Sequence, residues 1–194
     1  MQKLTRDSLY SLEEYSIKRE EFRNKVMQHK KFRRLDLGEH ISLYFEDRLT
    51  MQYQVQEMLR AERIFEAAAI HEELDAYNPL IPDGSNLKAT LMIQYENEDE
   101  RRAALQKLVD IENQIWLKID GFDKVRPIAD EDLERTDENK TSAVHFLRFE
   151  FNQAMISALK TGAKLATGVD HPAYQFTMEE IPKAITQALA NDFE

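Results

Sequence analysis

One stretch of the sequence, residues 48–63, carries a row of guanidinium and amide groups in place of the usual mixture of lysine and glutamate. At about 100° per residue, its five members fall within roughly a third of a helical turn. Arginine offers paired N–H donors in a planar fork, which suits carboxylate and phosphate groups. An anion-binding strip and an ordinary solvated helix face are therefore the two interpretations. The members of this strip are Arg48, Gln52, Gln56, Arg60 and Arg63.

Glu62 lies on the same predicted helix but projects into its apolar sector, between Met51 and Val55. An ionised carboxylate in that position must find a partner or take up a proton. We favour a buried ion pair with one of the arginines. The alternatives are a catalytic or metal-binding carboxylate, and a bent helix that exposes Glu62.

His145 lies on a predicted strand, residues 143–151, and shares a face with three apolar side chains, so it should point inward. A hydrogen-bonded core histidine is the favoured interpretation, and a catalytic acid or base is the alternative. Asp170 and His171 stand at the end of another predicted strand, where a turn is favoured. If the two strands are neighbours, His145, Asp170 and His171 supply nitrogen and carboxylate ligands for a metal ion.

Basic residues gather in one segment of an otherwise acidic chain, whose net formal charge is −10. The segment Lys18–Arg34 contains eight Lys and Arg residues and two Glu residues, a balance of +6 that leaves −16 for the remainder. A solvated helix face is the favoured interpretation, and a docking surface for an acidic protein partner is the alternative. The overall acidity argues against a general nucleic-acid binder.

The chain contains no cysteine, which excludes disulfides, thiolate zinc sites and Cys-ligated iron–sulfur clusters. No apolar run approaches the roughly 20 residues that span a bilayer, and the opening residues lack the plan of a secretory signal. We therefore expect a cytoplasmic protein with no membrane association. The oligomeric state stays open, because apolar helix faces suit a monomer or a dimer.

The pattern of apolar residues predicts one α+β domain over residues 1–194, with a helical N-terminal segment at about 5–34. Other helices are expected from residue 50 to about 71, over 98–112 and 153–160, and from about 177 to the end. The strands are too closely spaced for a doubly wound sheet, so we expect a mostly antiparallel sheet of about five to six strands packed with helices. The predicted strands are 40–45, 88–95, 114–120, 125–130, 143–151 and 165–169.

Several long segments resemble a bacterial family that is known as a domain of unknown function. They read LTRDSLYSLEEY, HISLYFEDRLTMQYQVQEMLRAERI, EELDAYNPLIPDGSNLKATLMI and GVDHPAY, and together they extend the resemblance over nearly the whole chain. Members of that family are often encoded beside rubrerythrin-like proteins and iron–sulfur proteins related to heterodisulfide reductase subunits. The resemblance thus implies a role near redox chemistry or peroxide defence. It carries over no catalytic residue, but the matching segments contain Asn78, which joins the strip as a candidate ligand-binding residue.

Three functions follow from these patterns. The favoured one is an accessory protein that docks on a redox or oxidative-stress partner through Lys18–Arg34. The second is a small-molecule enzyme or binding protein in which the strip holds an anionic ligand and Glu62 or His145 acts as acid, base or ligand. The third is a metal-binding regulator that uses His145, Asp170 and His171.

Overall fold

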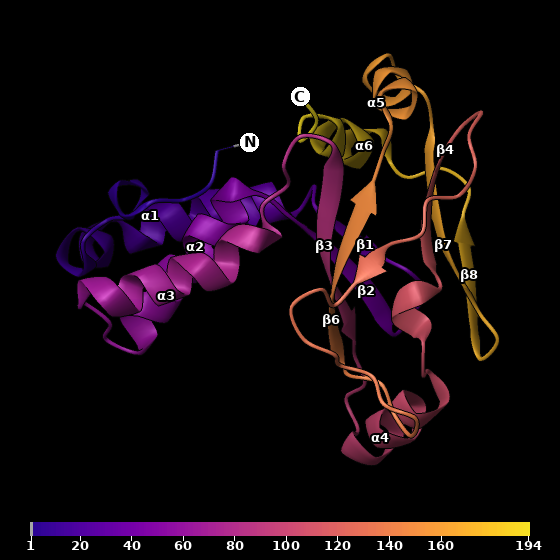
Figure 1. Ribbon diagram of the computed structural model, residues 1–194, viewed down its shortest axis with the longest axis horizontal. Helices are drawn as coiled ribbons and strands as arrows, with labels where there is room; N and C mark the ends of the chain where they lie inside the picture. Colours follow the sequence, from indigo (N-terminus) through magenta and orange to yellow (C-terminus); the bar gives the residue numbers. More distant parts are fainter. Residues whose placement is uncertain (1) are drawn as a thin grey trace.

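The N-terminal part of the chain forms a helical arm that projects from the side of a β-sheet in the computed structural model, which describes residues 2–194 (Figure 1). Two of its helices begin where a side chain satisfies a free backbone N–H group: Ser11 accepts from Glu14, and Asp47 accepts from Thr50. The arm consists of α1 (Leu12–Lys30), α2 (Arg48–Ala61) and α3 (Ala67–Tyr77), with short 3-10 turns at Arg6–Ser8 and Asn78–Leu80.

The strands form two antiparallel sheets, one with the order β1-β2-β3-β6-β5 and one with the order β4-β7-β8. The predicted α+β class with antiparallel strands is confirmed, although the strands divide between two sheets. The first sheet contains β1 (Arg34–Asp36), β2 (Ile41–Glu46), β3 (Asn86–Ile93), β6 (Val144–Glu150) and β5 (Ile128–Ala129). The second contains β4 (Ile115–Ile119), β7 (Leu165–His171) and β8 (Tyr174–Met178).

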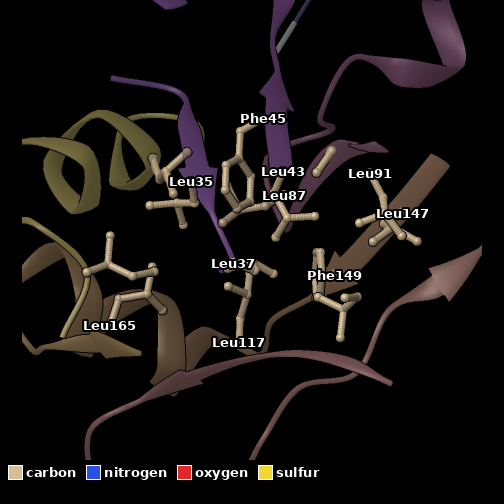
Figure 2. Close-up of a cluster of buried hydrophobic side chains, with 14 of the residues drawn as sticks. Leu35, Leu37, Leu43, Phe45, Leu87, Leu91, Leu117, Leu147, Phe149 and Leu165 are labelled. Atoms are coloured by element: carbon tan, nitrogen blue, oxygen red, sulfur yellow. The ribbon is translucent and has the colours of Figure 1, made fainter. Parts of the chain in front are cut away.

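The main hydrophobic core lies between the two sheets. Figure 2 shows Leu43 and Phe149 of the five-stranded sheet on one side of this core, with Leu117 and Leu165 of the three-stranded sheet on the other. All four side chains are fully buried, and each contributes about 1.5–3 kcal/mol of transfer free energy to folding. Two smaller apolar clusters hold the arm together.

The two ends of this sandwich are covered differently. Helices α5 (Gln153–Lys160) and α6 (Lys183–Ala190) lie at one end, and α4 (Glu98–Lys107) lies at the other, close to the start of β6 (Figure 1). A polar loop, residues 131–141, joins β5 to β6 and reaches α4, where the N–H of Thr141 donates to the carbonyl of Leu105 at 3.0 Å. Among residues 2–194, no helix is both long enough and apolar enough to cross a membrane.

The single helix predicted from residue 50 to about 71 is wrong, because the chain turns sharply after α2. Arg63 adopts a φ of 55°, and the N–H of Ile64 donates to the carbonyl of Leu59 at 2.9 Å. The turn contains neither glycine nor proline, so the sequence gives no local signal for it. Instead, the turn folds α3 back onto α2, and Ile70 then packs in the same apolar cluster as Leu59.

The predicted start of the C-terminal helix near Thr177 is also wrong. Residues 174–178 form β8, in which Tyr174, Phe176 and Met178 pack against the core on alternate positions. The helix α6 begins later, at Lys183. The alternation of apolar residues at 174, 176 and 178 is visible in the sequence and is typical of a strand. The spacing of Thr177 and Glu180 resembles a capping box, however, and favoured a helix.

Candidate metal centre

A buried histidine lies between two carboxylates at the end of the sandwich where α4 is found. His145 points inward from β6 and has no exposed surface. Its Nδ1 lies 2.6 Å from Asp130 Oδ2, and its Nε2 lies 4.0 Å from Glu112 Oε2. The hydroxyl of Thr141 lies 2.8 Å from Nε2, and the carbonyl oxygen of Ser142 lies 3.0 Å from it. Distant parts of the chain thus meet at one imidazole ring.

The hydrogen bonds around His145 satisfy both ring nitrogens. Nδ1 donates to the carboxylate of Asp130, which can only accept, and Nε2 lies within hydrogen-bond distance of the hydroxyl of Thr141. Arg135 Nη1 lies 3.3 Å from Asp130 Oδ1, and a hydrogen bond to Asp132 raises the pKa of this guanidinium above its ordinary value. Arg135 therefore faces the carboxylate of Asp130, which offsets the cost of burying that carboxylate.

Asp130 is positioned by an uncommon backbone conformation. It follows β5 directly and adopts a φ of 50°, a region that aspartate tolerates better than most residues. Its own N–H donates to the carbonyl of Phe146 at 2.8 Å, and its Oδ1 accepts the N–H of Phe146 at 3.0 Å. The side chain therefore extends the pairing of β5 with β6 and directs its second oxygen at His145.

Glu112 enters the cluster from a 3-10 turn, Ile111–Asn113, that immediately precedes β4. Its side chain is buried, and hydroxyl groups satisfy both of its oxygens. Thr136 donates to Oε1 at 2.6 Å, and Thr141 lies 3.3 Å from Oε2. Both threonines belong to the polar loop 131–141, so the cluster also fastens this loop to the end of the sandwich.

The cluster offers one nitrogen and two oxygen ligands for a metal ion. One atom each from Glu112, Asp130 and His145 lies within 4.8 Å of the other two. Imidazole and carboxylate ligands suit divalent ions such as Zn²⁺, Mn²⁺ and Fe²⁺. A carboxylate that holds Nδ1–H also orients the ring and raises the basicity of Nε2, as in many metal sites. The same contacts serve without a metal as a neutral hydrogen-bonded network.

The structure uses much of the predicted anion-binding strip to hold the N-terminal segment. Arg48 donates to the hydroxyl of Ser8 at 2.8 Å, and Gln52 donates to its carbonyl at 2.7 Å. Gln56 is fully buried and accepts the N–H of Tyr10 at 2.6 Å. The side chains of these three residues therefore contact the chain's own backbone and side chains.

Asn78 also holds the N-terminal segment through its side chain. Its Oδ1 accepts the N–H of Leu4 at 2.7 Å, and its Nδ2 donates to the carbonyl of Leu4 at 2.9 Å. Arg60, Glu62 and Arg63 are exposed at the end of α2. The bend after α2 places Glu62 in solvent, which is the third of the alternatives that the sequence left open. Ligand-binding and catalytic roles for these residues remain predictions.

Asp170 and His171 do not join His145 in the candidate metal-ligand group within residues 2–194. Asp170 Oδ2 lies 2.8 Å from Lys124 Nζ and 3.0 Å from Arg126 Nη2. His171 Nε2 lies 3.0 Å from the carbonyl oxygen of Val109. His145 is on β6 and Asp170 and His171 are on β7, and these strands belong to different sheets. The predicted metal set required the two strands to be neighbours, and they are not.

The basic segment Lys18–Arg34 is only partly available to a partner. Arg33 is 2% exposed and forms ion pairs with Asp47 and Asp192. Arg19 pairs with Glu57 at 2.7 Å. The remaining exposed cations lie mostly on α1, and they include Lys18, Arg23, Lys25 and Lys31.

Sequence reasoning identified His145 but not its partners. Glu112 stands at the predicted end of a helix, and Asp130 at the predicted end of a strand. Neither residue is at a recognisable ligand spacing from His145. The one available signal is the position of Asp130, directly after a short apolar strand and before a polar loop. Aspartate tolerates a positive φ better than most residues, so this position could have indicated a sharp turn there.

Comparisons with known proteins give the chain a family. The family DUF3501, described as a protein of unknown function, matches residues 3–193. A crystal structure from Burkholderia pseudomallei K96243, described as a novel protein of unknown function, is 52% identical in sequence. The match covers 100% of both chains, with a TM-score of 0.95. A comparison with curated proteins finds no match.

Proposed function

We propose a function from the geometry of the buried cluster, because the chain belongs to the DUF3501 family of proteins of unknown function and membership assigns no activity. The protein binds one divalent transition-metal ion at the cluster of Glu112, Asp130 and His145, with His145 and Glu112 as ligands and Asp130 holding the imidazole ring. The observation that carries this proposal is the convergence of one potential ligand atom from each residue within 4.8 Å in the interior. Metal binding was the third function that the sequence suggested, with Asp170 and His171 as the partners of His145.

The geometry of the cluster leaves one ring nitrogen for a metal ion. A metal binds only a ring nitrogen that carries no proton, and the two carboxylates favour a divalent cation beside it. With Nδ1–H still held by Asp130, the free nitrogen is Nε2, which faces Glu112 at 4.0 Å. The ligands are then His145 and Glu112, with Asp130 as the group that orients the ring. Binding is expected to weaken as the pH falls.

Metal titration of the purified, chelator-treated protein tests the proposal. We expect one Zn²⁺ or Co²⁺ ion per chain by elemental analysis, and a Co²⁺ absorption spectrum that reports a nitrogen ligand. The substitutions Glu112→Gln and Asp130→Asn keep the size of each side chain, and we expect each to weaken binding by about 10- to 100-fold. Circular dichroism checks that both variants are folded.

The variant Asp170→Asn is the matched control, since it removes a carboxylate that pairs with Lys124 and Arg126 elsewhere on the sandwich. It should bind metal as the wild type does. Absence of stoichiometric metal, or equal affinity in wild type and Glu112→Gln, contradicts the proposal. Loss of binding in Asp170→Asn alone contradicts it as well.

A second candidate function is docking on an acidic protein partner through the exposed face of α1. One observation favours it: Phe32, just after α1, is 48% exposed and lies near the exposed cations Lys31 and Arg34 in the sequence. An apolar side chain beside cations suits an acidic surface with an apolar centre. The redox identity of such a partner, and a location in the cytoplasm, remain part of this proposal.

Charge reversal on α1 tests the docking function. The variant Lys18→Glu/Lys25→Glu/Lys31→Glu should lose a partner that wild type retains in native extracts at low salt and releases at high salt. Arg33 is left unchanged because it is buried in an ion-pair network. Reversal of Lys118, which is exposed on β4, is the control. A partner that both variants retain equally contradicts docking through α1.

A further inference from the structure

A cleft lies where the helical arm meets the outer face of the five-stranded sheet. Its volume is about 520 Å³, which falls within the usual range for small-molecule sites. Tyr77 and Leu80 line it from the end of the arm, and Phe146, Arg148 and Lys88 line it from the sheet. This junction lies on the opposite side of β6 from the metal-ligand group, because Phe146 and His145 alternate along that strand. The two sites adjoin in the chain, since Glu131 and Asp132 directly follow Asp130.

Lys88 is the one lysine that lines this cleft, and its ammonium group lacks an ion-pair partner. Its Nζ donates to the carbonyl of Pro79 at 2.5 Å, and this is its hydrogen bond within residues 2–194. No carboxylate among those residues lies within 4.0 Å of Nζ. An ammonium group has three donors, so two remain for a ligand.

The second cation of the cleft is already neutralised. Arg148 donates two hydrogen bonds of 2.7 Å to Glu131, and it also pairs with Glu150. Asp75, Glu131 and Asp132 also line the cleft, so its carboxylates outnumber its two cations. A ligand with several negative charges is therefore disfavoured, whereas a single anionic group can reach Lys88.

Because Lys88 is half-buried, an anionic ligand would stabilise its charged form. Desolvation lowers the pKa of this lysine below its ordinary value, and the neighbouring Arg148 and Lys3 act in the same direction, while Asp83 and Glu131 oppose them. A half-buried charge without a partner costs free energy, and an anion placed against it recovers part of that cost. The apolar side chains that line the cleft lower the local dielectric and so strengthen such a pair.

We propose that this cleft binds a small monoanion with an apolar, ring-sized body. The carboxylate or similar head group pairs with Lys88, and the body packs against Tyr77, Leu80 and Phe146. An aromatic ring beside Phe146 has favourable edge or offset contacts available. The cleft shares no residue with the metal-ligand group, although the N–H of Phe146 donates to Asp130 Oδ1 at 3.0 Å.

Calorimetry with a matched pair of probes tests the proposal: 2-naphthoate carries the charge, and 2-naphthamide is its neutral counterpart. We expect wild type to bind 2-naphthoate at least about 10-fold more tightly than the amide. Lys88→Met removes the charge and retains a long apolar chain, so both probes should bind it with equal affinity. Leu80→Ala should weaken both probes alike.

Lys118→Met is the control, because Lys118 is exposed on a different sheet, and it should retain the preference for 2-naphthoate. The comparison of the two probes on wild type remains decisive if Lys88→Met does not fold. Equal affinity of wild type for the two probes, or no binding of 2-naphthoate at millimolar concentration, overturns the proposal. A preference that persists in folded Lys88→Met also overturns it.

Discussion

Asp130 Oδ2 lies 2.6 Å from His145 Nδ1, and Asp130 reaches this position with a backbone φ of 50°. Because the residue also pairs β5 with β6, a single aspartate couples the edge of the sheet to the buried imidazole. The polar loop that follows it then returns to Glu112 through Thr136 and Thr141. Stability of this end of the sandwich and any metal chemistry there therefore depend on the same side chain.

The first prediction concerns this aspartate. Asp130→Asn keeps the shape and the tolerance for positive φ but removes the carboxylate that accepts from His145 and pairs with Arg135, so we expect a loss of about 3 kcal/mol in the free energy of unfolding. Urea denaturation of the metal-free protein measures it. Asp132→Asn is the control, because Asp132 is exposed and pairs with the same Arg135. Its cost should stay within about 1 kcal/mol, and equal costs for the two variants contradict the prediction.

The second prediction is a pH dependence of stability that arises from Asp192. Burial, helped by the nearby carboxylate of Asp47, raises the pKa of Asp192 to about 6, although the ion pair with Arg33 opposes the change. The folded protein therefore binds this proton more tightly than the unfolded chain. The resulting stabilisation is fully present below the unfolded pKa, near 4, and is lost as the pH rises through about 6.

Asp192→Asn should remove this dependence. The difference in unfolding free energy between wild type and variant is then expected to shift by about 2 kcal/mol between pH 4.5 and pH 7, with wild type favoured at the lower pH. Asp47 has a lowered pKa, because hydrogen bonds and Arg33 outweigh the effect of its burial, so its own contribution changes only below this window. An identical pH profile for wild type and variant contradicts the assignment.

The third prediction concerns the close approach of Gly38 to Tyr174. Gly38 has a φ of 87°, and a Cβ atom there would lie 2.4 Å from Tyr174 Oη. Gly38→Ala should therefore cost about 2–3 kcal/mol, from backbone strain and from the clash together. Gly121 provides the control, since its φ is 84° but nothing lies within 4 Å of a Cβ atom. Gly121→Ala should cost only about 1 kcal/mol.

A double variant separates the two causes at Gly38. Tyr174→Phe removes the hydroxyl that clashes, and it also loses a hydrogen bond of 2.7 Å to the carbonyl of Leu37, worth about 1 kcal/mol. In Gly38→Ala/Tyr174→Phe the clash is relieved, so the measured loss should be smaller than the sum of the single losses. Strict additivity in urea denaturation indicates that strain alone is responsible.

Local sequence patterns predicted the fold class and several elements, because these depend on residue period and caps. Residues 153–160 were predicted as a helix, and α5 spans Gln153–Lys160, where Asn152 caps it. His145 was expected to point inward, and it is fully buried. The bend at Arg63 was not predictable, since it arises from α3 packing on α2. The meeting of Glu112 and Asp130 depends on how two sheets and a loop assemble, and no spacing in the sequence records it.

The last prediction follows from Asn78, which binds both the N–H and the carbonyl of Leu4. Asn78→Asp can still accept from the N–H of Leu4, but its second oxygen then faces the carbonyl of the same residue without a proton between them. We expect the N-terminal segment to detach and the free energy of unfolding to fall by about 1–2 kcal/mol. Trypsin should then cleave after Arg6 faster than in wild type, as mass spectrometry measures. Asn139→Asp, in the exposed polar loop, should leave the cleavage rate unchanged.

The same assay separates the two interpretations of the Arg48–Arg63 strip. If the strip binds an anion in place of the N-terminal segment, phosphate should speed cleavage of wild type after Arg6, because Arg48 and Gln52 then release Ser8. If these side chains only hold the segment, phosphate should leave the rate unchanged, and Gln56→Ala should raise it. The buried amide of Gln56 accepts the N–H of Tyr10 at 2.6 Å, so we expect the second outcome. Cleavage that phosphate accelerates would restore the anion-binding interpretation.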